Sequence, residues 1–415
     1  MSVNEYIAEA AAIELPSSDD EADNEHTEDG DVCSDQQLAK EFRVHYIKDE
    51  ALLDFNQLYV LSLAASADFT RLAVGQNNSA VKIYDLSEGG GLTKIYNELS
   101  PRSPIWRKKG REVVNRGVRF LDESGNTLLV GYSNGEVRLF DLRTSSDQAR
   151  FKATVKLTPS LPESIRCFDR NANSRILCCG TKRRTNTYLI FFDIRERKEL
   201  GLYCESHSDD ITSVRFHDTY PDLLCTGSTD GLINVFDIKE SNEDEALQNT
   251  INTESSVHRL DWYQNANNKE VITCITHTND FKSYECLEGD DWLSFERSEI
   301  VAGIRRKSPA NFNLINAHTM QDRGLFLLAG TNFNKGEILR SVTAPAKGLL
   351  KPFTNFVGNK QIVRESLYDA KRDLLITGGE SGIVSIWTSD ASNVNNYNNL
   401  KSTSAVAKKH KSTPY

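Results

Sequence analysis

The sequence lacks the features that mark membrane and secreted proteins. Its 415 residues contain no apolar run of about 18 residues, the length that a membrane-spanning helix needs. The N-terminus does not carry a basic stretch followed by an apolar one, so we do not expect a secretory signal peptide. We therefore expect a protein without a membrane span that resides in the nucleus, the cytoplasm or both.

Common catalytic signatures are also absent. The phosphate-binding motif G-x-x-x-x-G-K-[ST], the zinc motif H-E-x-x-H and the nucleophile motif G-x-S-x-G do not occur. The eight histidines do not pair at the spacing of metal ligands. The sequence therefore predicts no enzyme, no cofactor and no metal site.

Eight cysteines are present, but their spacing is not that of a zinc site or a disulfide framework. Cys178 and Cys179 are adjacent in an apolar run, and on a strand they would point to opposite faces. Cys167, Cys225 and Cys274 also fall in apolar runs. We expect buried free thiols in a reducing compartment.

Negative charge is concentrated at one end of the chain. Residues 1–40 hold twelve acidic residues and one Lys, whereas the whole chain has a net charge of −10, so the remainder is close to neutral. From Ser17 onward this segment has almost no apolar side chains, too few to offset the loss of chain entropy on folding. We predict a disordered acidic tail over residues 1–40, in which Asn4–Leu15 could form a short helix. Its role stays open between an interaction tail and a solubilising tail.

Two further expectations follow from charge. Residues 391–415 are polar and carry several lysines, so we predict a flexible basic tail there. The near-neutral central region has no broad excess of basic residues that could neutralise phosphates, so nucleic-acid binding is not expected.

One short pattern recurs along the chain. It consists of an apolar run, a Gly, a polar turn and a second apolar run that ends in an aromatic residue and Asp. The pattern's glycines are separated by 56, 49, 47, 103 and 48 residues, and the longest gap spans two periods: Gly75, Gly131, Gly180, Gly227, Gly330 and Gly378. A period of this length indicates a repeat architecture, in which each unit buries its apolar face against its neighbours.

The repeat around Gly227 reads as four short strands. Ile211–Phe216 alternates, Leu223–Cys225 and Leu232–Phe236 flank the turn Ser228-Thr229-Asp230-Gly231, and Leu247–Ile251 follows as a weaker strand. Gly231 can take the positive φ that such a turn needs. Short strands at this spacing, separated by turn signals, indicate a radial all-β array.

Counting such units gives seven, one of which is degenerate and begins near Ser256. The seventh lacks an outer strand, and the alternating segment Phe42–Ile47 could supply it, which would remove an exposed sheet edge. We therefore predict an all-β, seven-bladed β-propeller over residues 41–390, flanked by the acidic and basic tails, and expect it to be monomeric.

The aromatic-Asp endings and the Ser-Thr-Asp-Gly turn resemble WD40 repeats. In that family a His, a Ser or Thr, an Asp and a Trp form a hydrogen-bonded tetrad inside each blade. By position, His207, Thr226 and Asp230 match this tetrad, but Phe236 stands where the Trp belongs and has no N–H. Trp387 occupies the Trp position in the last repeat. The resemblance implies a divergent WD40 propeller and, as the general role of that family, a scaffold for protein partners.

Two predicted loops carry basic residues that could bind a partner. The loop from Asn97 to Arg116 contains a Trp among cations: Trp106, Arg107, Lys108 and Lys109. This group could anchor an acidic peptide or stack on a base, or the Trp could pack onto the ring while the charges are solvated. The loop from Gly289 to Ser308 contains Arg305 and Arg306. A contact between the acidic tail and these basic loops is a further possibility.

Two interpretations of function remain. The first is a non-enzymatic scaffold that mediates protein–protein interactions in a multi-protein complex. The second is a substrate receptor of a cullin-4 ubiquitin ligase, because some propellers of that group carry an aromatic-Asp-x-Arg box at the end of the third strand. The chain has two similar boxes, which end in Arg143 and Arg195, with Phe in the aromatic position.

Overall fold

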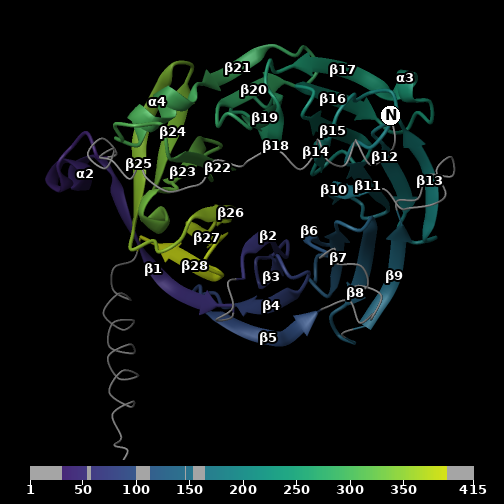
Figure 1. The fold of residues 1–415 in the computed structure, drawn as a ribbon, viewed down its shortest axis with the longest axis horizontal. Coiled ribbons are helices and arrows are strands. Elements are labelled where there is room, and N and C mark those ends of the chain that lie inside the picture. The colour runs from purple at the N-terminus through teal and green to yellow at the C-terminus, as the bar shows by residue number, and fades with distance from the viewer. Residues whose placement is uncertain (1–29, 54–57, 100–112, 145, 153–163, 390–415) are drawn as a thin grey trace, which may run out of the picture.

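The structure is a computed structural model that describes residues 30–53, 58–99, 113–144, 146–152 and 164–389. Within them the chain forms an all-β β-propeller, with sheets arranged around a central channel (Figure 1). Five sheets have four strands each, and a sixth has eight. The predicted propeller fold is therefore confirmed.

Each four-stranded sheet runs in chain order from the channel outward, and neighbouring strands within it are antiparallel. The first two sheets contain β2 (Val60–Ala65), β3 (Arg71–Gln76), β4 (Val81–Leu86) and β5 (Leu92–Leu99), then β6 (Asn115–Phe120), β7 (Thr127–Tyr132), β8 (Glu136–Asp141) and β9 (Ser146–Lys152). The third and fourth contain β10 (Ile165–Arg170), β11 (Ile176–Thr181), β12 (Leu189–Asp193) and β13 (Lys198–Tyr203), then β14 (Ile211–Phe216), β15 (Leu223–Ser228), β16 (Leu232–Asp237) and β17 (Leu247–Asn252). The fifth contains β18 (Val257–Gln264), β19 (Glu270–Thr276), β20 (Phe281–Glu285) and β21 (Asp291–Phe295).

The eight-stranded sheet has the strand order β22-β23-β24-β25-β1-β28-β27-β26. Its strands are β22 (Phe312–Thr319), β23 (Leu325–Thr331), β24 (Leu339–Ala346), β25 (Leu349–Val357), β1 (Arg43–Leu52), β28 (Ile383–Thr388), β27 (Leu374–Gly379) and β26 (Val363–Asp369). In the described ranges, four short helical segments lie outside the sheets: α2 (Asp35–Glu41), α3 (Glu243–Ala246), α4 (Arg297–Gly303) and the 3-10 turn η2 (Phe333–Gly336).

The N-terminal strand β1 joins the two halves of the eight-stranded sheet. It pairs antiparallel with β28, from Tyr46 opposite Thr388 to Leu52 opposite Ile383. The N-terminal region therefore supplies the outer strand beside the last repeat, as predicted, but the predicted segment Phe42–Ile47 is placed too early, because only Tyr46 and Ile47 of it pair with β28. The same strand also pairs parallel with β25, from Arg43 opposite Thr354, which the sequence did not predict.

The recurring glycine of the sequence pattern lies where successive sheets approach closely. A Cβ at Gly180 would lie 2.7 Å from Cγ2 of Ile211 in the next sheet, and a Cβ at Gly227 would lie 2.5 Å from Cγ1 of Val257. At Gly378 the obstructing atom is Cγ1 of Val60, also at 2.5 Å, so the last repeat packs against the first. The spacing of these glycines in the sequence therefore reflects the positions where neighbouring sheets pack closely.

Apolar side chains fill the spaces between successive sheets. Val60, Leu72 and Val74 of the first sheet pack with Ile376 and Ile386 of the last repeat in one buried cluster. Equivalent clusters lie at the other junctions around the ring. Burial of this kind contributes about 25 cal/mol per Å² of apolar surface, so the junctions are the main source of stability.

The turn at Gly231 has the expected backbone conformation, with a φ of +86°. The prediction that Gly289 to Ser308 forms a loop is wrong for most of this segment, because the segment contains β21 and α4. Strand β21 was missed because only alternate side chains in it are buried, which leaves a weak apolar signal.

Strand directions define two faces that the remaining sections use. The upper face carries the connections between consecutive sheets and the turns between the second and third strands of each sheet. The lower face carries the other turns, between the first and second strands and between the third and fourth. Residues 30–41, which lie mostly within the predicted acidic tail, are packed on the upper face, where Asp31 contacts Arg306 of the connection between the fifth and eight-stranded sheets.

We predict that Ile47 of β1 stabilises the closed ring. This side chain packs against the cluster that contains Trp387, so Ile47→Ala should lower the free energy of unfolding by about 1–3 kcal/mol, less than a fully buried Ile because it is only half-buried. Leu52→Ala in the same strand is the matched control, because Leu52 is 53% exposed and its loss should change stability by about 0.5 kcal/mol or less. Equal urea midpoints for the two variants would contradict the role of Ile47.

Candidate functional site

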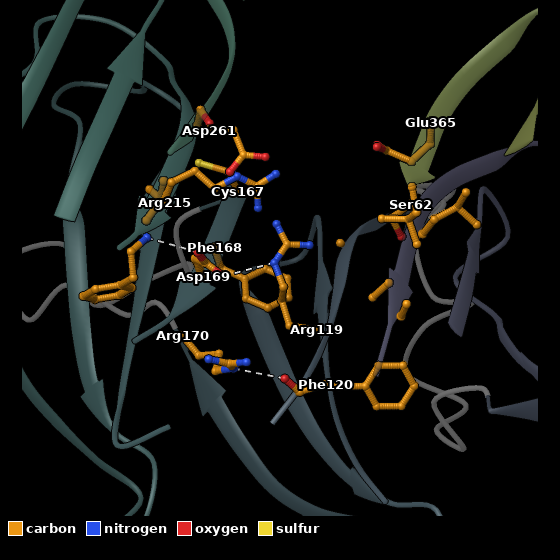
Figure 2. A pocket seen from close by; sticks show the side chains of 18 of the residues that line it. Ser62, Arg119, Phe120, Cys167, Phe168, Asp169, Arg170, Arg215, Asp261 and Glu365 are labelled. Atoms are coloured by element: carbon orange, nitrogen blue, oxygen red, sulfur yellow. Dashed lines mark hydrogen bonds and ion pairs between the residues drawn. The ribbon is translucent and has the colours of Figure 1, made fainter. Parts of the chain in front are cut away.

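A cavity of about 610 Å³ occupies the central channel and is lined mainly by the innermost strand of each sheet (Figure 2). Most of its arginines are engaged by neighbouring sheets. Arg119 donates from Nε to Oδ1 of Asp169 at 3.0 Å, and Arg170 donates from Nε to the carbonyl oxygen of Phe120 at 3.0 Å. These contacts link β6 to β10, so the charged lining of the channel holds adjacent sheets in register.

A second ion pair crosses from β18 to β26. Arg259 donates from Nη1 and Nη2 to the two carboxylate oxygens of Glu365 at 2.7 and 2.8 Å. Bidentate pairs of this geometry are among the stronger charge-assisted interactions in proteins. This ion pair therefore compensates both charges and links two inner strands of the channel.

Burial shifts the pKa values of several titratable groups in the channel. Burial lowers the pKa of His318 to about 3, which leaves a neutral and weakly basic ring, and burial raises the pKa of Cys167 to about 12. Burial also raises the pKa of Asp218, with a further contribution from the carboxylates of Asp261 and Asp169. In the part of the chain that the structure describes, no group of His, Cys, Asp or Glu side chains is placed to hold a metal ion.

The mouth of the channel on the upper face differs from its interior. Arg116 is the second residue of β6. Its guanidinium has no hydrogen-bond or ion-pair partner among the described residues, although its Nε atom is buried. Burial and the nearby Arg166 lower the pKa of Arg116, which reflects a cation that is partly dehydrated and repelled by another cation. A negative group at this point would relieve both costs.

Asp210 contacts two of the basic residues at this mouth. Its Oδ2 lies 2.9 Å from Nη2 of Arg166, and its Oδ1 accepts a hydrogen bond of 2.7 Å from the backbone N–H of Arg183. Lys182 and Arg183 are exposed in the turn that follows β11, on the same face. We call Arg116, Arg166, Lys182 and Arg183 the basic mouth. Among the described residues, Asp210 is the carboxylate that contacts these cations, through the side chain of Arg166 and the backbone of Arg183, so Arg116 and Lys182 are left without an ion pair there.

The tetrad-like residues are brought together in the fourth sheet. The ring of His207 contacts Oδ2 of Asp230 through Nδ1 at 3.1 Å and Oγ1 of Thr226 through Nε2 at 2.8 Å. Phe236 is fully buried beside them and, lacking an N–H, leaves the fourth position of the tetrad apolar. Asn234 Nδ2 instead donates to the carbonyl oxygen of Ser206.

Trp387 is not part of that group. It lies in β28, at the position equivalent to Phe236, and its indole N–H donates to Oγ1 of Thr377 at 2.9 Å. The two pairs, Thr226 with His207 and Thr377 with Trp387, each preserve one half of a tetrad. They serve to connect strands within a sheet, and neither is exposed to a ligand.

We predict that Thr226→Val destabilises the protein. The change keeps the side-chain shape but removes the hydroxyl partner of Nε2 of His207 and leaves it only the longer 3.4 Å contact with Nδ2 of Asn234, which should lower the free energy of unfolding by about 1–3 kcal/mol. Thr219→Val, in an exposed turn of the same sheet, is the control and should have little effect. Chemical denaturation that gave the same midpoint for both variants would show that the His207–Thr226 contact does not contribute.

The candidate partner-binding residues fall in three places. Trp106, Arg107, Lys108 and Lys109 lie outside the described residues. Arg305 and Arg306 lie on the upper face, where the N-terminal segment engages them: Nε of Arg305 is 2.6 Å from Oε2 of Glu41, and Nη1 of Arg306 is 3.4 Å from Oδ1 of Asp31. The structure therefore brings this pair together with the chain's own acidic residues.

Arg143 and Arg195 follow the third strands of neighbouring sheets and lie on the lower face, away from the basic mouth. Arg143 is 70% exposed and forms a two-pronged contact with Asp141 of its own box, at 2.9 and 2.7 Å. Arg195 is exposed, and its side chain has no ion-pair partner among the described residues. Asp193 of its box instead lies 3.5 Å from Nε of Arg175.

Arg166 and Asp210 were not identified from the sequence. A signal existed for the arginine: Arg116 and Arg166 are each the second residue of the innermost strand of consecutive repeats. Aligning the repeats would have placed them side by side. Asp210 carries no comparable signal, because its role depends on the turn of the preceding sheet.

Comparison with known proteins agrees with the propeller geometry. The model of the WD domain, G-beta repeat (WD40), matches residues 198–237, which span β13 to β16. The resemblance to WD40-repeat proteins is therefore confirmed. None of the helices in the described ranges is both long and apolar enough to cross a membrane.

Three WD-repeat proteins illustrate the similarity. The WD repeat-containing protein 89 homolog of Dictyostelium discoideum is 24% identical over 364 residues, which cover 86% of this chain and 92% of that protein. The WD repeat-containing protein GTS1 of Arabidopsis thaliana is 23% identical over 378 residues, which cover 86% of this chain and 88% of that protein. An uncharacterized WD repeat-containing protein of Schizosaccharomyces pombe is 25% identical over 278 residues, 65% of this chain and 81% of that protein. The chain is thus similar to WD repeat-containing protein 89 over most of its length.

Proposed function

We propose that this protein is a non-enzymatic scaffold of a multi-protein complex, and that its basic mouth binds an acidic segment of a partner protein. The observation that carries the proposal is Arg116, a partly buried guanidinium at the entrance to the channel that has no anionic partner among the described residues. Propellers similar to WD-repeat proteins generally mediate protein interactions, which agrees with this assignment.

The chemistry of the basic mouth favours carboxylates. Arginine presents a planar set of donors that matches a carboxylate in two-pronged geometry. Arg166 already forms an ion pair with Asp210, through a single contact of 2.9 Å between Nη2 and Oδ2, which supports a second carboxylate beside Arg116. The surrounding rim is built from strand ends that need little ordering on binding, so less conformational entropy is lost when a peptide docks.

We also infer that the ring has seven blades, with the eight-stranded sheet counted as two. Strands β22–β25 would form one blade, and β26–β28 with β1 would form the other, joined by the parallel pairing of β1 with β25. The presence of a buried cluster between these two halves, which includes Phe326 and Trp387, supports this division. With this count of blades, the chain would consist of an N-terminal segment (residues 1–40), the propeller (41–390) and a C-terminal segment (391–415).

A second candidate function is that of a cullin-4 substrate receptor. Arg143 and Arg195 are both exposed on the lower face of adjacent sheets, so an adaptor bound there would leave the basic mouth open to a substrate. The scaffold proposal does not require these arginines. Residence in the nucleus or cytoplasm, a monomeric propeller and the absence of nucleic-acid binding complete the proposal.

We predict that Arg116→Glu removes the partner. Tagged wild type, Arg116→Glu and the control Lys371→Glu, an exposed Lys on the lower face, would be purified from the protein's own cells and their partners quantified by mass spectrometry. Loss of a charge-assisted contact of roughly 1.5–3 kcal/mol should reduce recovery of the acidic partner about tenfold or more in Arg116→Glu alone.

The same experiment separates the two candidate functions. Recovery that is unchanged in Arg116→Glu would contradict the basic mouth as the binding site. Arg143→Ala/Arg195→Ala should leave the partners of a scaffold in place, whereas loss of a cullin-4 adaptor in this double variant would favour the receptor.

A further inference from the structure

The N-terminal segment is clamped to the upper face by one carboxylate. Asp31 accepts hydrogen bonds from Nη1 and Nη2 of Arg340 at 2.7 and 2.8 Å, and Nη1 of Arg306 lies 3.4 Å from its Oδ1. Arg306 and Arg340 are only 5% and 4% exposed. Burial acts to raise the pKa of Asp31, but the two arginines outweigh it and hold the pKa below its usual range. The carboxylate therefore stays charged at neutral pH.

Backbone contacts extend this clamp. The N–H of Lys307 donates to the carbonyl oxygen of Gly30 at 3.1 Å, and the N–H of Val32 donates to that of Arg305 at 3.0 Å. Glu41, at the end of α2, pairs with Arg305. The chain is thus fixed from Gly30 onward, and residues 1–29 start from a defined point on the upper face.

The sequence of residues 1–29 is complementary to the basic mouth. It holds ten acidic residues and no Lys or Arg. The basic mouth lies on the same face and carries Arg116, which has no anionic partner within the part of the chain that the structure describes. The acidic residues of 1–29 are tethered to the face that carries the basic mouth, so their attraction to its arginines and lysine favours an intramolecular contact.

The tether is long enough to reach. A flexible chain of this length has a root-mean-square span of roughly 30 Å, and mutual repulsion of its charges extends it further. A propeller of this size has a radius of gyration of roughly 20 Å, so the channel entrance is within reach of a tether fixed at the outer part of the ring. Tethering of this kind gives effective concentrations on the order of millimolar.

We propose that residues 1–29 occupy the basic mouth in cis and compete with the acidic partner. This inference rests on the proposed function, because it assigns the chain's own acidic segment to the same site. Binding of the partner then requires displacement of the N-terminal segment. The Asp31 clamp raises the effective concentration of that segment by keeping its attachment point on the upper face.

The test uses two labelled probes, a peptide with the sequence of residues 1–29 and an unrelated Glu-rich peptide of equal length. Each is titrated by fluorescence anisotropy into the full chain and into a chain that lacks residues 1–29 but keeps every described residue. We expect both probes to bind the shortened chain at least tenfold more tightly than the full chain. This binding should weaken with salt and be lost in Arg116→Glu, but persist in the control Lys371→Glu.

A full-length variant removes the need for truncation. Asp19→Asn/Asp20→Asn/Glu21→Gln/Asp23→Asn should bind the probes more tightly than wild type, and Ser17→Ala/Ser18→Ala is its control of unchanged charge. Equal affinity of a probe for the full and shortened chains, still dependent on Arg116, would overturn the competition in cis and leave the proposed site intact. Failure of both probes to bind the shortened chain in an Arg116-dependent manner would overturn the acidic-segment site itself.

Discussion

The pairing of β1 with both β25 and β28 is the interaction on which the rest of the structure depends. It joins the N-terminus to the last repeat, so the ring is held closed by backbone hydrogen bonds as well as by packing. Without it, β25 and β28 would each present an unpaired edge. The same strand fixes the path of residues 30–42, and hence the position of Asp31 on the upper face. Strand β1 thus closes the ring and also sets where the N-terminal segment is attached on the upper face.

Close approach between sheets explains why the fold could be predicted from the sequence. In several repeats a glycine lies where the next sheet's innermost strand packs closely, as at Gly227 against Val257. Because this constraint recurs at the same position of those repeats, it leaves a regular spacing in the chain. The turn at Gly231 and the strand that begins near Phe42 were predictable for similar local reasons.

Other features left no local signal. Asp31 and Arg340 are 309 residues apart, and only the closed ring brings them together. The parallel pairing of β1 with β25 depends on the relative placement of two repeats, which no single segment encodes. Strand β21 is half exposed, so its alternating burial is weak in the sequence. The basic residues at 106–109 were identified by type, but they lie outside the described residues.

The channel separates two electrostatic regions with different roles. Inside, ion pairs such as Arg259 with Glu365 are satisfied and hold the blades. At the entrance, Arg116 has no partner among the residues that the structure describes, and this contrast supports the proposal that it binds a partner.

Hydrogen–deuterium exchange of the intact protein tests closure by β1 most directly. The account predicts that backbone amides of β1 between Tyr46 and Leu52 exchange about as slowly as those of β27, because both strands open only with the ring. Exchange of β1 at the rate of an unpaired terminal segment, while β27 stays protected, would contradict it.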